Sequence, residues 1–139
     1  MVNGIIIGIR EKLKETFGDS YGIYSGAPAD EWRTPCFAIA CLGSQSKQLL
    51  GKRSLQKHSF SIKYLSDGGT DAQAECLTIQ ETLFAALEYI YVGGDLARGK
   101  EMGGRFADNA LDFTVAYEFF VLAADDTDQM ETLAVTLRN

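Results

Sequence analysis

The stretch at residues 111–122, LDFTVAYEFFVL, decides the fold of this chain. Side chains of an extended strand alternate between two faces, and one face of this stretch collects six large apolar residues: Leu111, Phe113, Val115, Tyr117, Phe119 and Val121. A helix would not gather these six side chains on one stripe. Each large side chain that becomes fully buried contributes about 1.5–3 kcal/mol. We therefore expect this stretch to be the central strand of a sheet.

Length and composition indicate one globular domain over residues 1–139. The chain is 46% apolar and 11% aromatic, which separates it from disordered proteins. Its longest apolar run is a few residues, so we expect no membrane-spanning segment. Charges arrive at Arg10 to Lys14, which favours an amphipathic helix over a signal peptide. The odd number of cysteines, 3, is typical of a reducing compartment without a disulfide framework.

Hydrophobic periodicity predicts the other elements. Apolar residues recur at three- and four-residue spacing in two segments, and alternation or short apolar runs mark the strands. The predicted elements are helices over 3–17 and 70–90 and strands over 21–24, 35–42, 57–65, 96–107, 111–122 and 132–137. A two-residue turn at Asp108-Asn109 joins two of these strands. The order α-β-β-β-α-β-β-β predicts an α+β fold, with a mixed or mostly antiparallel sheet and both helices packed on one face.

The segment at residues 43–58 is polar and basic, and it is long for a connection in a compact domain. If the flanking strands extend into it, the result is a protruding β-hairpin. Seven residues in each direction would reach roughly 20–25 Å. A hairpin of that length can touch a neighbouring subunit.

Acidic and basic residues are separated along the chain, whose net charge is −6. Residues 43–58 carry bases and no acid: Lys47, Lys52, Arg53 and Lys57. Residues 64–97 carry acids and no Lys or Arg: Asp67, Asp71, Glu75, Glu81, Glu88 and Asp95. Two complementary patches on one subunit suit head-to-tail self-association. The alternative is that both are solvated faces without a partner.

The sequence predicts no catalytic, cofactor-binding or metal-binding residue. Cys36 and Cys41 stand five positions apart on one strand, so they face opposite sides, and with Cys76 they are interpreted as core thiols. His58 lies at a strand end beside Lys57, where we expect a surface or hairpin role. No phosphate-binding loop is present. The basic segment lacks interleaved aromatic residues and the whole chain is acidic, so specific nucleic-acid binding is not expected.

The chain resembles the phage tail terminator family in motifs that follow one another over nearly its whole length. The motifs are Phe17-Gly18-Asp19, Ile23-Tyr24, Pro35-Cys36-Phe37 with Ile39, Gly51 with Arg53, Phe60, Ile62 and Tyr64, Leu83-Phe84, Leu87-Glu88-Tyr89-Ile90, Gly94-Asp95-Leu96, Arg98-Gly99, Met102, Phe113, Val115, Tyr117, Phe119-Phe120-Val121, and Met130 with Leu133 and Val135. Gly103-Gly104 and the loop at 27–34 depart from the family pattern.

The resemblance implies a small structural protein of the virion tail or neck, assembled in the cytoplasm of the bacterial host, with no enzymatic activity. Such proteins form a ring, typically a hexamer, on the finished tail tube. The ring ends polymerisation of the tube protein and offers a surface to the head–neck connector. The expected partners are therefore further copies of the chain, the tail tube protein and the connector. No cofactor, no specific nucleic acid and no membrane are expected.

This resemblance gives the two charged segments a role. We hypothesise that Lys47, Lys52, Arg53 and Lys57 of one subunit meet the acidic helix face of the next subunit, at Asp71, Glu75 and Glu81. The final strand, with Leu133 and Val135, is expected to pair at a sheet edge of its own chain or of a neighbour. Two alternatives remain: another neck or head-completion connector, and a small-molecule-binding or enzymatic domain. A deep pocket with convergent polar groups would indicate the latter.

Overall fold

The computed structural model describes residues 1–26, 29–68, 71–107, 110–122 and 136–138, and its central strand is β6 (Ala110–Leu122). β6 pairs antiparallel with β3 along its whole length, and on its other side it pairs with β5 and with the short β7. The face predicted to be apolar is the buried one, and it is covered by both helices. The prediction of a central strand at residues 111–122 is therefore confirmed.

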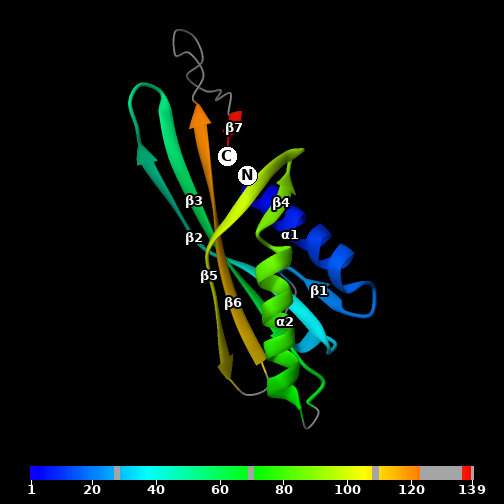
Figure 1. The fold of residues 1–139 in the computed structure, drawn as a ribbon. Helices are drawn as coiled ribbons and strands as arrows, with labels where there is room; N and C mark the ends of the chain where they lie inside the picture. The colour runs from blue at the N-terminus through cyan, green and yellow to red at the C-terminus, as the bar shows by residue number, and fades with distance from the viewer. Residues whose placement is uncertain (27–28, 69–70, 108–109, 123–135, 139) are drawn as a thin grey trace.

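The protein has an α+β fold in which a mixed sheet curves into a half-barrel and carries both helices on one face (Figure 1). The elements besides β6 are α1 (Val2–Phe17), β1 (Gly22–Tyr24), the 3-10 turn η1 (Ala29–Glu31), β2 (Cys36–Gln48), β3 (Arg53–Leu65), α2 (Ala72–Ala86), β4 (Tyr89–Val92), β5 (Asp95–Ala107) and β7 (Thr136–Arg138). The strands are ordered β1-β2-β3-β6-β5-β4, and β7 joins β6 off this path. The β1–β2 pair is parallel and the other pairs are antiparallel.

The second helix ends earlier than predicted, because the segment assigned to its last turn forms the strand β4. α2 stops at Ala86, and the apolar residues after it alternate with period two, so that Ile90 and Val92 are buried. Gly93 and Gly94 both have positive φ, 60° and 89°, which lets a two-residue turn return the chain into β5. The predicted turn at Asp108-Asn109 lies outside the described residues.

The predicted hairpin at residues 43–58, called the arm below, is present. β2 and β3 pair antiparallel up to Gln48 and Ser54, with one register shift between Cys41 and Gly43, and the chain turns at residues 49–52. β6 extends beside β3 as a third strand, with Leu122 opposite Arg53. In Figure 1 the upper ends of β2, β3 and β6 rise beyond both helices. Since no described helix covers this end of the sheet, every residue of β2 from Ala40 to Gln48 is exposed.

His58 is buried at the base of the arm, so of the two expected roles the surface role is wrong, whereas the residue does lie in the hairpin, opposite Ser44. The register places it between Ser44 and Tyr117 on the inner face of the sheet, and 5% of its surface is exposed. Its Nδ1 lies 2.6 Å from the Ser44 hydroxyl, and its Nε2 lies 3.2 Å from both the Gln56 side-chain oxygen and the Met1 sulfur. Burial lowers the pKa of His58, because a charged imidazolium loses its hydration there.

A close approach between α1 and β4 requires a glycine. A Cβ atom on Gly8 would lie under 3.0 Å from the carbonyl oxygen of Tyr91, which is backbone and cannot turn away. A Cβ atom on Gly4, one helical turn earlier, would meet the Val92 side chain at an ordinary 3.6 Å. The two glycines therefore lie on the same side of α1. Only at Gly8 is there no room for a larger side chain.

We predict that Gly8→Ala lowers the free energy of unfolding by about 1–3 kcal/mol, because the helix must move away from β4. Gly4→Ala is the matched control, and it should be neutral or stabilising by up to about 1 kcal/mol, since alanine favours helix. Urea unfolding of both variants measures the difference. Equal effects of the two substitutions would contradict the close approach.

The buried His58 predicts a pH dependence of stability. Its pKa is lower in the folded protein than the ordinary value of 6.5, so the unfolded chain binds more protons between these two values. Stability should therefore be full above about pH 6.5 and decrease as the pH falls through the lowered value. The urea midpoint should drop between pH 7.5 and pH 5.5 in the wild type and drop less in His58→Gln. Parallel curves for the two proteins would show that His58 does not titrate on unfolding.

Candidate functional site

The predicted basic residues lie along the arm, but they do not form one uniform patch. Lys47, Lys52 and Arg53 are exposed near its end. The Arg53 guanidinium lies 6.0 Å from the centre of the Phe120 ring, so it is held against β6 by a cation–π contact. Lys57 is half-buried and forms an ion pair with Glu101 of the same chain. The exposed cations of this set therefore lie at the end of the arm.

The predicted acidic residues lie on α2 and at its start. Asp71 and Glu81 are exposed. Glu75 is half-buried and accepts a hydrogen bond from the Tyr64 hydroxyl. Burial first, and then the bond to this carboxylate, raise the pKa of Tyr64. Glu75 therefore has a structural partner within its own subunit, unlike the exposed carboxylates of Asp71 and Glu81.

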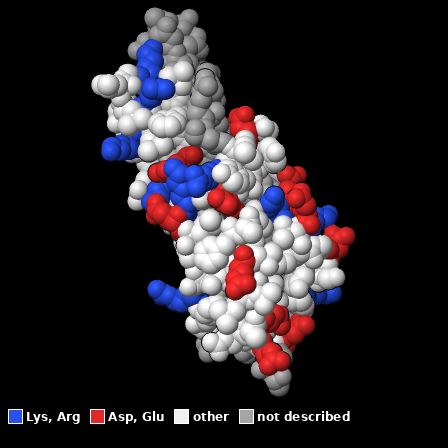
Figure 2. All heavy atoms as spheres, in the orientation of Figure 1, with Lys and Arg blue, Asp and Glu red and all other residues white. Residues whose placement is uncertain are grey.

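The two charged regions lie toward opposite ends of the molecule. Figure 2 shows basic side chains gathered at the arm end, and acidic side chains at the lower end, over the start of α2. α2 packs against β5, β6 and α1, whereas the arm is built from β2 and β3. The structure thus keeps the two sets apart, and Lys57 and Glu75 each have a partner in their own subunit. That separation is what a head-to-tail contact requires.

The predicted C-terminal strand is partly described. β7 pairs antiparallel with the end of β6, with Leu137 opposite Val121, so it lies at a sheet edge of its own chain. Leu133 and Val135, which were candidates for an interface, lie outside the described residues.

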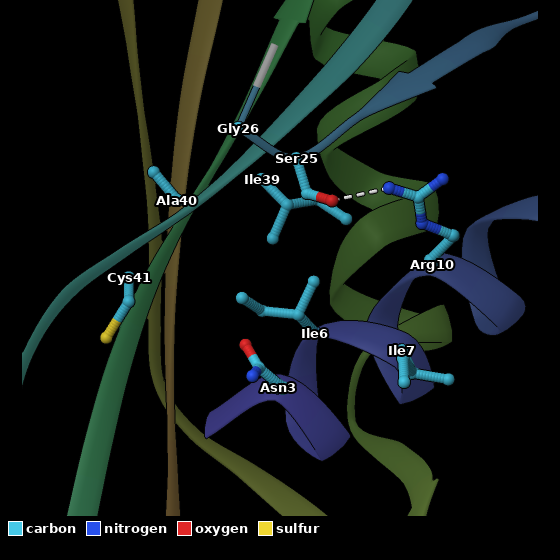
Figure 3. Close-up of a pocket in the computed structure, with 9 residues that line it drawn as sticks. All are labelled: Asn3, Ile6, Ile7, Arg10, Ser25, Gly26, Ile39, Ala40 and Cys41. Atoms are coloured by element: carbon cyan, nitrogen blue, oxygen red, sulfur yellow. Dashed lines mark hydrogen bonds between the residues drawn. The ribbon is translucent and has the colours of Figure 1, made fainter. Parts of the chain in front are cut away.

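A groove that the sequence analysis missed runs between α1 and β2 (Figure 3). Its volume is about 620 Å³, and its lining is mostly apolar: Asn3, Ile6, Ile7, Arg10, Ser25, Gly26, Ile39, Ala40 and Cys41. Arg10 is the charged member of the lining, and it donates a hydrogen bond to the Ser25 hydroxyl. The groove is open to solvent, and Ile7 is 55% exposed.

One signal in the sequence could have revealed this groove. Residues 5–7 are three consecutive isoleucines on a helix, and a helix turns by about 100° at each residue. They cannot all face one core. Ile5 is fully buried, Ile6 is half-buried and Ile7 points out of the fold. The third isoleucine therefore marks an apolar surface outside the core.

The strand beside the groove has an open edge. β1 pairs with β2 from Cys36 to Ala38 and then ends. From Ile39 to Gln48, β2 has β3 on one side and no strand on the other among the described residues. An open edge presents unpaired N–H and C=O groups, which can bind an added strand.

The thiols and tyrosines of the described part of the chain give no sign of a reacting centre. Cys36 and Cys76 are buried, and burial raises the pKa of both thiols, so they are held in the unreactive protonated form. Cys41 is exposed, which corrects its interpretation as a core thiol. Burial also raises the pKa of Tyr117, whose hydroxyl donates to the Leu87 carbonyl oxygen.

The described residues contain no group of three or more His, Cys, Asp or Glu side chains that could hold a metal ion. Within the same residues, no helix has the length and apolar character needed to cross a membrane.

Comparison with known proteins identifies the family. No curated protein matches the chain. One solved structure superposes on it with a TM-score of 0.41 at 9% sequence identity, covering 91% of this chain and 98% of the other, and so distant a likeness supports no argument. The family model described as phage tail terminator protein matches residues 4–129, from α1 to beyond the end of β6. The chain therefore belongs to the phage tail terminator family.

Proposed function

We propose that this protein assembles into a ring, a hexamer, on the end of the phage tail tube, where it ends polymerisation of the tube protein and forms the joining surface for the head–neck connector. Membership of the tail terminator family supports a structural role in tail assembly. The ring and its hexameric state are what the resemblance to this family implies, and the charged surfaces of the subunit are compatible with them. Assembly takes place in the cytoplasm of the bacterial host, and the product becomes part of the virion.

The ring is supported by one observation, the separation of two complementary charged surfaces on one subunit. A ring uses head-to-tail contacts, in which each subunit presents one surface forward and a different surface backward. The arm presents Lys47 and Arg53, and the start of α2, toward the other end of the molecule, presents Asp71. Opposite charges on these surfaces bring subunits together in one orientation and disfavour contacts between like surfaces.

The internal contacts of the subunit narrow the proposed interface. Lys57 and Glu75 are occupied within their own chain, by Glu101 and by Tyr64. We assign the contact between subunits to Lys47, Lys52 and Arg53 at the end of the arm and to the carboxylates of Asp71 and Glu81, because these side chains are exposed. Lys57 and Glu75 stabilise the two surfaces instead of joining them.

We predict that Lys52→Glu together with Arg53→Glu weakens assembly about tenfold, which corresponds to roughly 1.4 kcal/mol. Repulsion then replaces attraction at the end of the arm. Light scattering, with and without purified tail tubes, measures the particle mass, and raised salt should weaken wild-type assembly because exposed charges are screened.

The matched control is Lys12→Glu with Lys14→Glu, which makes the same change of charge on α1, outside the arm. It should leave the particle mass unchanged. Restored assembly when the arm variant is mixed with Asp71→Lys plus Glu81→Lys subunits would identify the partner surface. Unchanged mass in the arm variant would remove the arm from the interface, and wild-type protein that never exceeds a monomer, even on tubes, would refute the ring.

A further inference from the structure

We propose that the groove between α1 and β2 receives an extended segment of the neighbouring copy of this chain, which adds a strand to the open edge of β2. This inference rests on the proposed ring. In this proposal the groove is part of the interface between subunits. Main-chain hydrogen bonds then hold the subunits together in addition to the attraction between opposite charges.

The hydrogen-bond pattern shows which backbone groups are available. The Leu49 N–H donates to the Arg53 carbonyl oxygen at 2.9 Å, so this pair is hydrogen-bonded across the hairpin. In an antiparallel pair the direction of these bonds alternates from residue to residue. In the register of β2 and β3, the N–H and C=O groups of Ser44, Ser46 and Gln48 therefore point away from β3, toward the open edge.

This edge differs from the opposite end of the sheet. At the opposite edge, the outer side of β4 is covered by α1, whose Gly8 lies directly against the Tyr91 carbonyl. Among the described residues β4 pairs only with residues 95–98 of β5, and the part of β5 beyond it carries three charged residues, Lys100, Glu101 and Arg105. Proteins usually protect an exposed edge with prolines, several charges, β-bulges or a very short strand. β2 continues for ten residues beyond Ala38, contains no proline and has a single charged residue, Lys47. The register shift between Cys41 and Gly43 is the one irregularity in its pairing with β3.

The groove offers a binding surface for the side chains of an added strand. When a strand joins a sheet edge, main-chain bonds provide affinity, and alternate side chains enter the neighbouring pocket. Ile6, Ile7 and Ile39 offer apolar surface for such side chains (Figure 3). Arg10 and Ser25 close one part of the groove with polar groups, which suit a carboxylate or a carbonyl of the incoming segment.

A second copy is the occupant because the groove is continuous with the arm. β2 forms both one wall of the groove and one strand of the arm, and it carries Lys47 seven residues after Ala40. A neighbour whose acidic surface meets the end of the arm is therefore positioned along the same strand. The chain is itself acidic, with a net charge of −6, so another copy provides the charge that Lys47 and Arg10 attract.

The reactivity of Cys41 tests whether the groove is covered. Cys41 lines the groove and is exposed, whereas the other two thiols are buried. We expect a maleimide to label Cys41 at least about tenfold more slowly in the assembled ring than in the free subunit. A ring in which Cys41 reacts at the rate of the free subunit would refute the groove contact and leave the proposed ring intact. Failure to form any ring would refute both.

The identity of the occupant is tested with a photo-cross-linking phenylalanine at position 7, on the groove side of α1. Irradiation of assembled particles should join two copies of this chain. The same amino acid at Thr16, an exposed position outside the groove lining, is the control and should give a much lower yield. Cross-links to the tube protein, or no excess of cross-linked dimer over the control, would overturn the second copy as occupant.

Strand addition itself is tested at Ser46. Ser46→Pro removes one N–H that points to the open edge and leaves the bonds between β2 and β3 in place. Ser46→Ala keeps that N–H and is the matched control. We expect the proline variant to fold with an unchanged circular dichroism spectrum and to assemble at least about tenfold more weakly than the alanine variant. Equal assembly of the two folded variants would show that the edge does not receive a strand.

Discussion

The two-sided pairing of β6 is the interaction on which the rest of the structure depends. β3 runs along one side of this strand from Ala110 to Leu122, while β5 and β7 share the other side. Its inner face is buried under α1 and α2 over the lower part of the sheet. Because the same strand continues past the helices, the arm is an extension of the core sheet and has a rigid base. A surface built in this way can hold charge at a fixed distance from the core.

The extended sheet explains why one end of the molecule is suited to contacts with other chains. Where the helices end, β2 loses its neighbour β1 and keeps an open edge. His58 marks this boundary, since it is still buried beneath the start of α1 while β2 opposite it is exposed. Near this boundary two large apolar side chains are exposed, Ile7 of α1 and Leu42 of β2. Charge at the end of the arm and an open edge along its side belong to one continuous surface.

Much of the fold could be predicted from local patterns. The strand at residues 111–122 and the amphipathic first helix are each predicted from the local spacing of apolar residues. Both were confirmed. β4 was missed because Leu87 and Ile90 also fit a helical stripe, and only pairing with β5 decides between the two. The burial of His58 was missed for a related reason. It depends on α1, more than forty residues away in the chain, lying across the inner face of the sheet.

The candidate site was less predictable than the fold. The separation of charges was visible in the sequence, but the pairing of Lys57 with Glu101 and of Glu75 with Tyr64 joins residues from different elements. The groove also depends on how α1 lies against β2. The central claim, that the subunit acts by capping a tube with copies of itself, is tested most directly by tail-tube growth. Purified tube protein polymerised with this protein should stop elongating and carry a ring at one end in electron micrographs. Tubes of unchanged length with bare ends would contradict the claim.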